Sequence, residues 1–220
     1  MMLPRVSVND LTREDTMATD VSIRVLSWKE AAGFVHLWPT HRISLLDPDD
    51  AALAAVSPRP DLVTIEMEVA DVTDPNHPHA ATASDVRRLL EVGAHLPSGA
   101  RVLVHCRGGI GRSPAAAMIV LVAADRSPEQ ALEQVLQVRR MARPNPWLLL
   151  LADRQRGVRR RGLFPVWLAW AHRQEFFHPV PNRVVRDGLA GRLGWDEQIE
   201  LVKAQTHKQR GVSHGRHRRA

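Results

Sequence analysis

The chain has 220 residues, of which 44% are hydrophobic and 25% are charged, a composition typical of a globular protein. No apolar run approaches the length of a membrane-spanning helix, so no membrane insertion is expected. The polar N-terminus has no apolar segment of the kind that directs secretion. The single cysteine, Cys106, excludes an internal disulfide, which favours a reducing compartment. We therefore expect the protein in the cytoplasm.

The net charge of +6 is unevenly distributed along the chain. Residues 1–152 hold 15 Lys and Arg against 18 Asp and Glu, whereas residues 153–220 hold 15 against 6. The basic character therefore belongs to the C-terminal part alone. That part is expected to meet the acidic remainder of the chain or an anionic partner, and we do not expect a nucleic acid as ligand.

Predicted strands alternate with predicted helices along the first 156 residues. Apolar and alternating patterns predict strands at residues 21–27, 41–47, 61–69 and 100–106. Amphipathic patterns and capping signals predict helices at residues 27–34, 83–95, 111–124, 127–140 and 145–156. This alternation predicts an α/β fold with a central, mainly parallel, twisted sheet of four to five strands flanked by helices.

We divide the chain into three parts. Residues 1–19 are expected to be a flexible segment, residues 20–156 the α/β domain, and residues 157–220 a basic extension with a disordered tip. The extension contains large apolar side chains that are costly to leave in water, so we expect a helix over residues 165–177, packed on the domain or on a partner. A further helix is expected over residues 194–205.

The stretch "HCRGGIGRS", residues 105–113, joins a buried strand to a helix N-terminus. Such a turn directs backbone N–H groups into one concavity, where the helix dipole adds roughly half a positive charge. Three glycines allow the backbone to curl tightly, and Arg112 offers a planar fork that fits two oxygens of a phosphate. Cys106 lies in this field, which favours its thiolate, and Ser113 is placed to donate a hydrogen bond to the sulfur. His105 is expected to brace the loop by hydrogen bonds.

Two other kinds of phosphate-binding loop are excluded by residue type. A nucleotide-binding loop of the G-x-x-x-x-G-K-[ST] type requires a lysine, which is missing here. A dinucleotide fingerprint requires G-x-G-x-x-G, which "GGIG" does not supply.

The motif resembles the H-C-x5-R-[ST] signature of the protein tyrosine and dual-specificity phosphatase superfamily. The preceding strand "RVLVHC", the small-residue helix that follows and "RPNP" some 30 residues later agree with it, and the resemblance covers residues 20–156. It is closest to the small bacterial tyrosine-phosphatase-like proteins. The resemblance implies that residues 20–156 are a cysteine-based phosphatase domain in which Cys106 is the nucleophile, Arg112 holds the phosphoryl group and Ser113 assists departure of the thiolate. It also implies a phosphate-binding cradle formed by Arg107, Gly108, Gly109, Ile110, Gly111 and Arg112.

Enzymes of this family need a general acid that protonates the leaving oxygen, and in the family it is an aspartate on a loop some 30 residues before the cysteine. In this sequence the corresponding loop begins after the strand "TIEMEV". Asp71 lies where the smaller members carry their acid, and Asp74 is the rival candidate. The resemblance therefore implies Asp71 as acid and then as base.

No cofactor and no metal site are expected. His77 and His79 lack further ligands at a suitable spacing, and a solvated loop explains them. Asn145 is interpreted as a helix N-cap. Because the chain contains no tyrosine, the deep pocket of classical tyrosine phosphatases is not predicted. The substrate class stays open among a phosphorylated protein, a phosphoinositide and a small phosphate ester. The alternative function is a catalytically weak module that binds phosphorylated partners.

Overall fold

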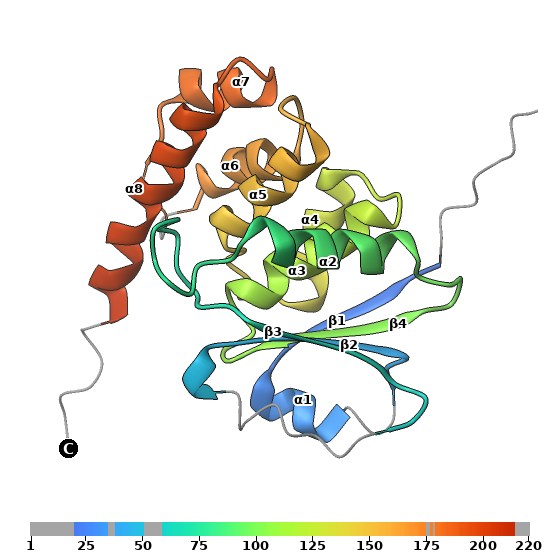
Figure 1. Cartoon of the computed structure of the whole chain (residues 1–220). Helices are drawn as coiled ribbons and strands as arrows, with labels where there is room; N and C mark the ends of the chain where they lie inside the picture. The colour runs from blue at the N-terminus through green and yellow to red at the C-terminus, as the bar shows by residue number, and fades with distance from the viewer. Residues whose placement is uncertain (1–19, 35–37, 51–58, 175–176, 178, 214–220) are drawn as a thin grey trace, which may run out of the picture.

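A four-stranded sheet, all of it parallel, forms the centre of the molecule in the computed structural model (Figure 1). The structure describes residues 20–34, 38–50, 59–174, 177 and 179–213, with the backbone alone for residues 206–213. The strands are β1 (Ser22–Ser27), β2 (His41–Leu46), β3 (Val63–Glu68) and β4 (Arg101–Cys106), in the order β1-β4-β2-β3. The predicted α/β fold is thus confirmed, with four strands.

The central strand β4 places Cys106 at a shared edge of the sheet. Residues 102–106 of this strand are all buried, as expected for a strand that has neighbours on both sides. Cys106 pairs in register with Ser27 of β1 and with Leu45 of β2. Because all four strands are parallel, the loops that follow them emerge at the same edge as the cysteine.

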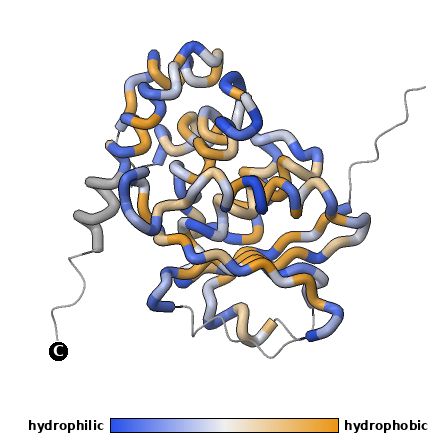
Figure 2. The backbone as a smooth tube through the Cα atoms, viewed as in Figure 1, coloured by the Kyte–Doolittle hydropathy of each residue, from blue (hydrophilic) through white to orange (hydrophobic). Residues whose placement is uncertain are grey.

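Helices cover both faces of the sheet, and their ends agree with the predicted capping signals to within about two residues. Helix α1 (Trp28–Phe34) lies on one face (Figure 1). The other face carries α2 (Ala83–Ala94), α3 (Arg112–Ala123), α4 (Pro128–Val138) and α5 (Pro146–Arg156). The apolar residues of the sheet and of α3 form a continuous core between the layers (Figure 2).

The C-terminal extension packs on this core. It forms α6 (Leu163–Ala171), α7 (Asn182–Leu189) and α8 (Trp195–Ser213), of which α7 was not predicted. Trp167 is fully buried and belongs to the same apolar cluster as the sheet. The sequence left open whether the apolar residues of the extension pack on the domain or on a partner. In the structure they pack on the domain.

The first helix of the extension differs from the one predicted over residues 165–177. It begins at Leu163, because the buried carboxylate of Asp153 in α5 accepts hydrogen bonds from the amides of Leu163 and Phe164, both at 2.8 Å. It ends at Ala171, before the predicted end. The helix α8 begins one residue after its predicted start and continues to Ser213.

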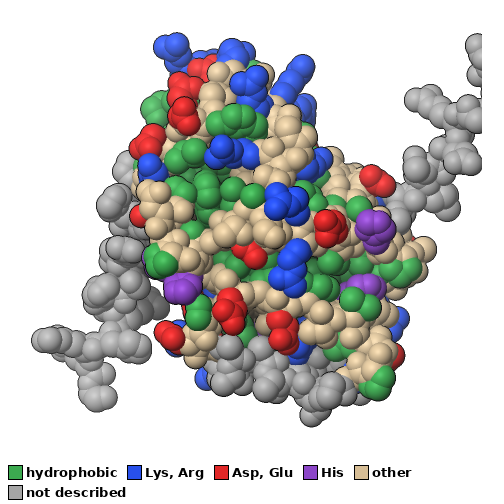
Figure 3. All heavy atoms as spheres, in the orientation of Figure 1, with side chains coloured by type: hydrophobic (Ala, Val, Ile, Leu, Met, Phe, Trp, Pro, Cys, Tyr) green, Lys and Arg blue, Asp and Glu red, His purple; other side chains and the backbone are tan. Residues whose placement is uncertain are grey.

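Lys and Arg side chains gather over the upper helices of the face drawn in Figure 3, where α6 and α7 lie in Figure 1. The predicted flexible segment 1–19 and the last part of the predicted disordered tip, residues 214–220, lie outside the described residues. Among the described helices, none combines the length and the apolar character that a membrane crossing requires.

Candidate active site

The carboxyl ends of all four strands deliver side chains to one region. Cys106 ends β4, and Asp47 directly follows β2. Asp71 lies three residues beyond the end of β3, and Glu30 lies in the first turn of α1 directly after β1. Parallel topology thus brings together residues that are far apart in the sequence.

The sulfur of Cys106 is buried and receives two hydrogen bonds. The amide of Gly109 and the hydroxyl of Ser113 both donate to Sγ at 3.2 Å. Cys106 is 1% exposed, and Ser113 is fully buried at the N-terminus of α3. The hydroxyl of Ser113 is thus placed to donate to the sulfur, as the sequence led us to expect.

The predicted phosphate loop, residues 107–111, is held from outside by one later segment of the chain, residues 139–145. Arg139 donates from Nη2 to the carbonyl of Gly108 and from Nε to that of Gly109, both at 3.1 Å. The amide of Arg143 donates to the carbonyl of Ile110 at 2.8 Å. The amide of Asn145 donates to the carbonyl of Gly111 at 3.1 Å. Four successive loop carbonyls therefore point outward.

Outward carbonyls determine where the loop N–H groups point. In a trans peptide the N–H lies opposite to the C=O, so each outward carbonyl turns the next amide inward. The inward amides are those of Gly109, Ile110, Gly111 and Arg112. The bond from the Gly109 amide to Cys106 Sγ shows this orientation directly. Four of the six residues expected to form the cradle therefore turn their amides inward, and inward amides beside a helix N-terminus are suited to an anion. The part of Arg107 and Gly108 in the cradle stays a prediction.

One loop glycine is required by its backbone conformation and by close contacts. Gly109 has φ +67°, and a Cβ there would lie 2.6 Å from the carbonyl carbon of Leu26. The loop therefore packs too closely against β1 for a larger residue at this position. Gly111 lies directly against the carboxylate of Asp71.

The guanidinium of Arg112 is buried beside the loop and is oriented by groups at the ends of two strands. Its Nη1 donates to the carbonyl of Val69 at 2.6 Å, and Nη2 lies 2.9 Å from Asp47 Oδ2. The Nε is 3.9 Å from Asp71 Oδ2 and, among the described residues, has no hydrogen-bond partner. A buried donor without a partner is costly, and an anion oxygen in the cradle would satisfy it.

The structure separates the two candidates for the general acid. Asp71 contacts the loop: it faces Gly111, and Nδ2 of Asn145 donates to its Oδ1 at 2.9 Å. Asp74 instead accepts the amide of Asn76 within its own turn and interacts electrostatically with Lys203 of α8. Only Asp71 of the two is thus placed against the phosphate loop.

Asn145 does more than the predicted N-cap. Its Oδ1 accepts the amides of Trp147 and Leu148 at the start of α5, which confirms the cap. Its Nδ2 donates to Asp71 and also to the carbonyl of Val72 at 3.0 Å. One buried side chain therefore joins α5 to the aspartate loop, a role that the sequence analysis missed.

Arg139 is anchored by the carboxylate of Glu30 at the start of α1. Its Nη1 donates to Glu30 Oε1 at 2.9 Å, while Oε2 of Glu30 accepts the amide of Ser27 at 2.7 Å. The hydrogen bond from Arg139 lowers the pKa of Glu30 to about 2. Neither residue was predicted to support the site, because the signal for this contact is long-range.

His105 does not brace the loop as predicted. It is 1% exposed, and neither ring nitrogen has a hydrogen-bond partner among the described residues. Burial, together with the charge of Arg42, lowers the pKa of His105 to about 4. The imidazole is therefore neutral at physiological pH and acts as a packed side chain beneath the site.

Two exposed side chains of the loop, Arg107 and Ile110, border the opening of the site. Arg107 is exposed, with Nη1 3.4 Å from Oδ2 of the buried Asp50. Ile110 is 39% exposed. A hollow of about 160 Å³ beside the loop is lined by Asp71, Ile110, Gly111, Arg143 and Asn145. No cluster of three or more His, Cys, Asp or Glu residues suited to a metal ion occurs in the part of the chain that the structure describes.

No protein-family model and no curated protein matches this chain. Solved structures that it is similar to include human DUSP28, with 16% identity over 61% of this chain and 91% of that chain and a TM-score of 0.48. Another is the human tyrosine phosphatase-like serine/threonine/tyrosine-interacting protein, with 17% identity, 60% and 85% coverage and a TM-score of 0.46. The Cydia pomonella PTP-2 phosphatase matches at 21% identity, 60% and 84% coverage and a TM-score of 0.44. The resemblance to the protein tyrosine and dual-specificity phosphatase superfamily, and to its small bacterial subgroup, therefore stays a prediction from the sequence motif.

Proposed function

We propose that the protein is a phosphomonoesterase that works through a cysteinyl-phosphate intermediate. The observation that carries this proposal is the arrangement around Cys106, whose sulfur receives a loop amide and the Ser113 hydroxyl at the N-terminus of α3. A thiolate held in this way faces a cradle of inward amides that binds a phosphoryl group. Nucleophile and anion site therefore coincide.

In the first step the thiolate of Cys106 attacks phosphorus. The S–P bond forms, the P–O bond to the leaving group breaks, and Asp71 protonates the departing oxygen. The loop amides and the Nε of Arg112 bind the three phosphoryl oxygens and match the charge of the transition state. The unpartnered Nε and the position of Asp71 against Gly111 support these roles.

In the second step water hydrolyses the intermediate. Asp71, now ionised, accepts a proton from the water as it attacks phosphorus, and the S–P bond breaks. The hydroxyl of Ser113 donates to the sulfur and stabilises the thiolate as it leaves. The products are an alcohol or phenol and inorganic phosphate, and no metal or cofactor takes part.

A substrate panel with EDTA present tests this function. The panel comprises an aryl phosphate, phosphotyrosine and phosphothreonine peptides, and inositol phosphates. We expect hydrolysis of the aryl phosphate and of at least one physiological class, insensitive to the chelator, and none by Cys106→Ser. Tight binding of phosphopeptides without any turnover would instead identify a phosphate-binding module and would refute the enzymatic proposal.

A further inference from the structure

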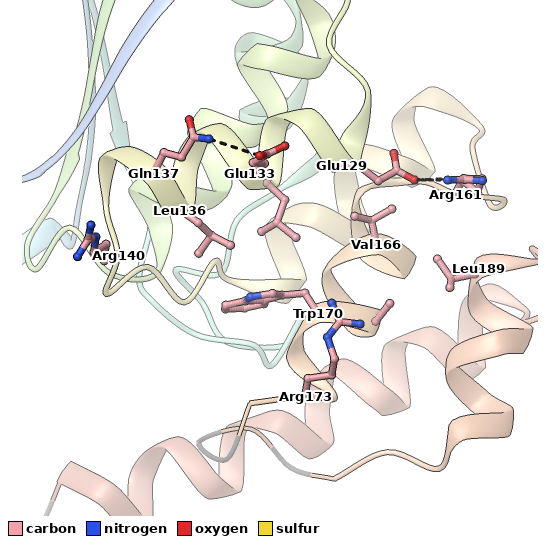
Figure 4. A pocket seen from close by; sticks show the side chains of 12 residues that line it. Glu129, Glu133, Leu136, Gln137, Arg140, Arg161, Val166, Trp170, Arg173 and Leu189 are labelled. Atoms are coloured by element: carbon pink, nitrogen blue, oxygen red, sulfur yellow. Dashed lines mark hydrogen bonds and ion pairs between the residues drawn. The ribbon is translucent and has the colours of Figure 1, made fainter.

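A hollow of about 730 Å³ lies between α4 and α6, apart from the phosphate loop (Figure 4). Its floor is apolar and is formed by Leu136 of α4, Val166 and Trp170 of α6, and Leu189 of α7. Trp170 and Leu136 are partly buried, so the apolar surface is recessed and does not protrude. A recessed apolar floor of this size fits side chains of a bound ligand.

Two arginines border this floor without a carboxylate partner. Arg140 and Arg173 are exposed, and neither has a carboxylate within ion-pair distance in the described part of the chain. In Figure 4 Arg173 lies beside Trp170, whereas Arg140 lies toward the other end of the hollow. A third rim residue, Arg161, is already paired with Glu129 at 2.8 Å. The rim thus offers positive charge above an apolar floor.

Neighbouring hollows share lining residues in sequence from this hollow to the candidate active site. A neighbouring hollow of about 480 Å³ shares Arg140 and Trp170 with the first and adds Met141 and Arg143. Arg143 also lines the hollow of about 160 Å³ that contains Asp71. Shared lining residues therefore connect the floor of the first hollow to the general acid.

Positive charge also continues at the opposite end. A hollow of about 560 Å³ shares Arg161 and Leu189 with the first and adds Arg160, Arg186 and Arg192. Across these four neighbouring hollows seven arginines line the surface, against Glu129, Glu133 and Asp71, and two of the seven are already paired, Arg161 with Glu129 and Arg192 with Asp187. Such an excess of one sign favours an anionic occupant.

We propose that this surface binds the acidic peptide segment that adjoins the phosphorylated residue of a protein substrate. The arginine groove, as we name it, is lined by Leu136, Arg140, Arg143, Val166, Trp170 and Arg173. Aspartate and glutamate side chains of the peptide pair with the arginines, and an apolar side chain between them occupies the floor. The inference rests on the proposed function and assigns it a protein substrate with an acidic flank.

A peptide fits this surface better than a membrane does. The arginines border a concave floor, whereas a flat bilayer requires apolar side chains that protrude. Leu136 and Trp170 of the groove are partly buried, and the exposed apolar side chain of Met141 belongs to the neighbouring hollow and not to the groove lining. The planar forks of arginine are also suited to carboxylates presented singly along a chain.

The test compares the wild-type chain with the double variant R140E/R173E. The substrates are phosphotyrosine and phosphothreonine peptides with glutamates and a leucine on one flank of the phosphorylated residue. One set carries them on the N-terminal flank and another on the C-terminal flank. Matched peptides carry glutamine in place of glutamate. A double variant R159E/R183E, which changes two exposed arginines that line none of these hollows, is the control for net charge. An aryl phosphate is assayed in parallel, because it cannot reach the groove.

We expect the wild type to prefer the acidic peptides and to lose that preference as salt is raised. R140E/R173E should lower kcat/KM on the acidic peptides about tenfold, mainly through KM, because each reversed charge replaces an attraction by a repulsion. Its activity on the aryl phosphate and on the glutamine peptides should match that of the wild type, as should all activities of R159E/R183E.

Several results would overturn the proposal. Equal kcat/KM on acidic and glutamine peptides, with the aryl phosphate still hydrolysed, would refute the groove and leave the proposed function intact. If no peptide is hydrolysed, peptide binding measured by fluorescence anisotropy still tests the groove, because equal affinity for acidic and glutamine peptides would refute it. Groove-dependent binding to vesicles of equal parts phosphatidylcholine and phosphatidylserine, without selection among peptides, would assign the surface to membranes. A dimer in sedimentation that R140E/R173E dissociates would assign it to a second copy of the chain.

Discussion

Replacement of Arg139 by lysine tests whether the phosphate loop depends on support from outside. In the wild type the guanidinium spans the carbonyls of Gly108 and Gly109 and is itself anchored by Glu30. A lysine keeps the positive charge but has no fork, so it reaches one loop carbonyl at most. The other carbonyl is released, and the amide that follows it loses its fixed inward direction.

The size of the effect follows from the bonds that are lost. One hydrogen bond to a charged group contributes roughly 1.5 kcal/mol, which corresponds to about a tenfold change in rate. Arg139→Ala removes both bonds, and we expect a loss of about a hundredfold. Glu30→Gln should cost less, because the Glu30 side chain is 45% exposed and solvent screens its ion pair to about 1 kcal/mol or below.

The assay is kcat/KM on an aryl phosphate, measured alongside the free energy of unfolding in urea. We expect kcat/KM to fall in the order wild type, Glu30→Gln, Arg139→Lys, Arg139→Ala. The free energy of unfolding should change little in Glu30→Gln and in Arg139→Lys. Arg140→Lys, at the adjacent residue, which makes no bond to the loop, is the matched control. Wild-type activity in Arg139→Ala would show that the loop holds its shape alone and would refute this reasoning.

Three further predictions concern the aspartate loop and the extension. Asp71→Asn should slow hydrolysis of an ester with a poor leaving group by roughly 10² to 10⁴ and that of an activated aryl phosphate far less; if Asp74→Asn shows this pattern instead, the assignment is wrong. Asn145→Ser keeps an N-cap but loses the donor to Asp71, so urea midpoints should change little while rates on poor leaving groups fall about tenfold; equal rates would argue against a positioning role. Burial raises the pKa of Asp153 to about 7, so its contribution to stability is present below about pH 4 and lost as pH rises through 7. The difference in unfolding free energy between the wild type and Asp153→Asn, measured in urea, should therefore shift against the wild type from pH 5 to pH 8, and an unchanged difference would contradict this prediction.

The fold and the centre of the site could be predicted because their signals are local. The strand before Cys106, the glycines after it and the start of α3 lie within one short stretch, and each has a direct conformational meaning. Alternating strands and helices then imply a parallel sheet, which by itself brings Asp71 to the edge where Cys106 lies. The resemblance favoured Asp71 over Asp74, but the contacts that distinguish the two could not be predicted, because the direction of a loop side chain depends on its tertiary contacts.

The supporting residues could not be predicted, because their partners are distant in the sequence. Arg139 follows the loop by about 30 residues and Glu30 precedes it by almost 80, and each appears locally as an ordinary helix-terminal charge. The start of α6 was misplaced for the same reason. Its cap, Asp153, lies ten residues earlier in another helix and is recognisable only when both helices are packed.

The most direct test of the central claim is to identify the phosphorylated atom during turnover. The wild-type protein is mixed with an aryl phosphate, quenched in acid, digested and examined by mass spectrometry, with Cys106→Ser treated in parallel. The account predicts one phosphoryl group on the peptide that contains Cys106, and none in the variant, which should be inactive. Turnover without any phosphoryl group on Cys106, or hydrolysis by Cys106→Ser at a rate near that of the wild type, would contradict it.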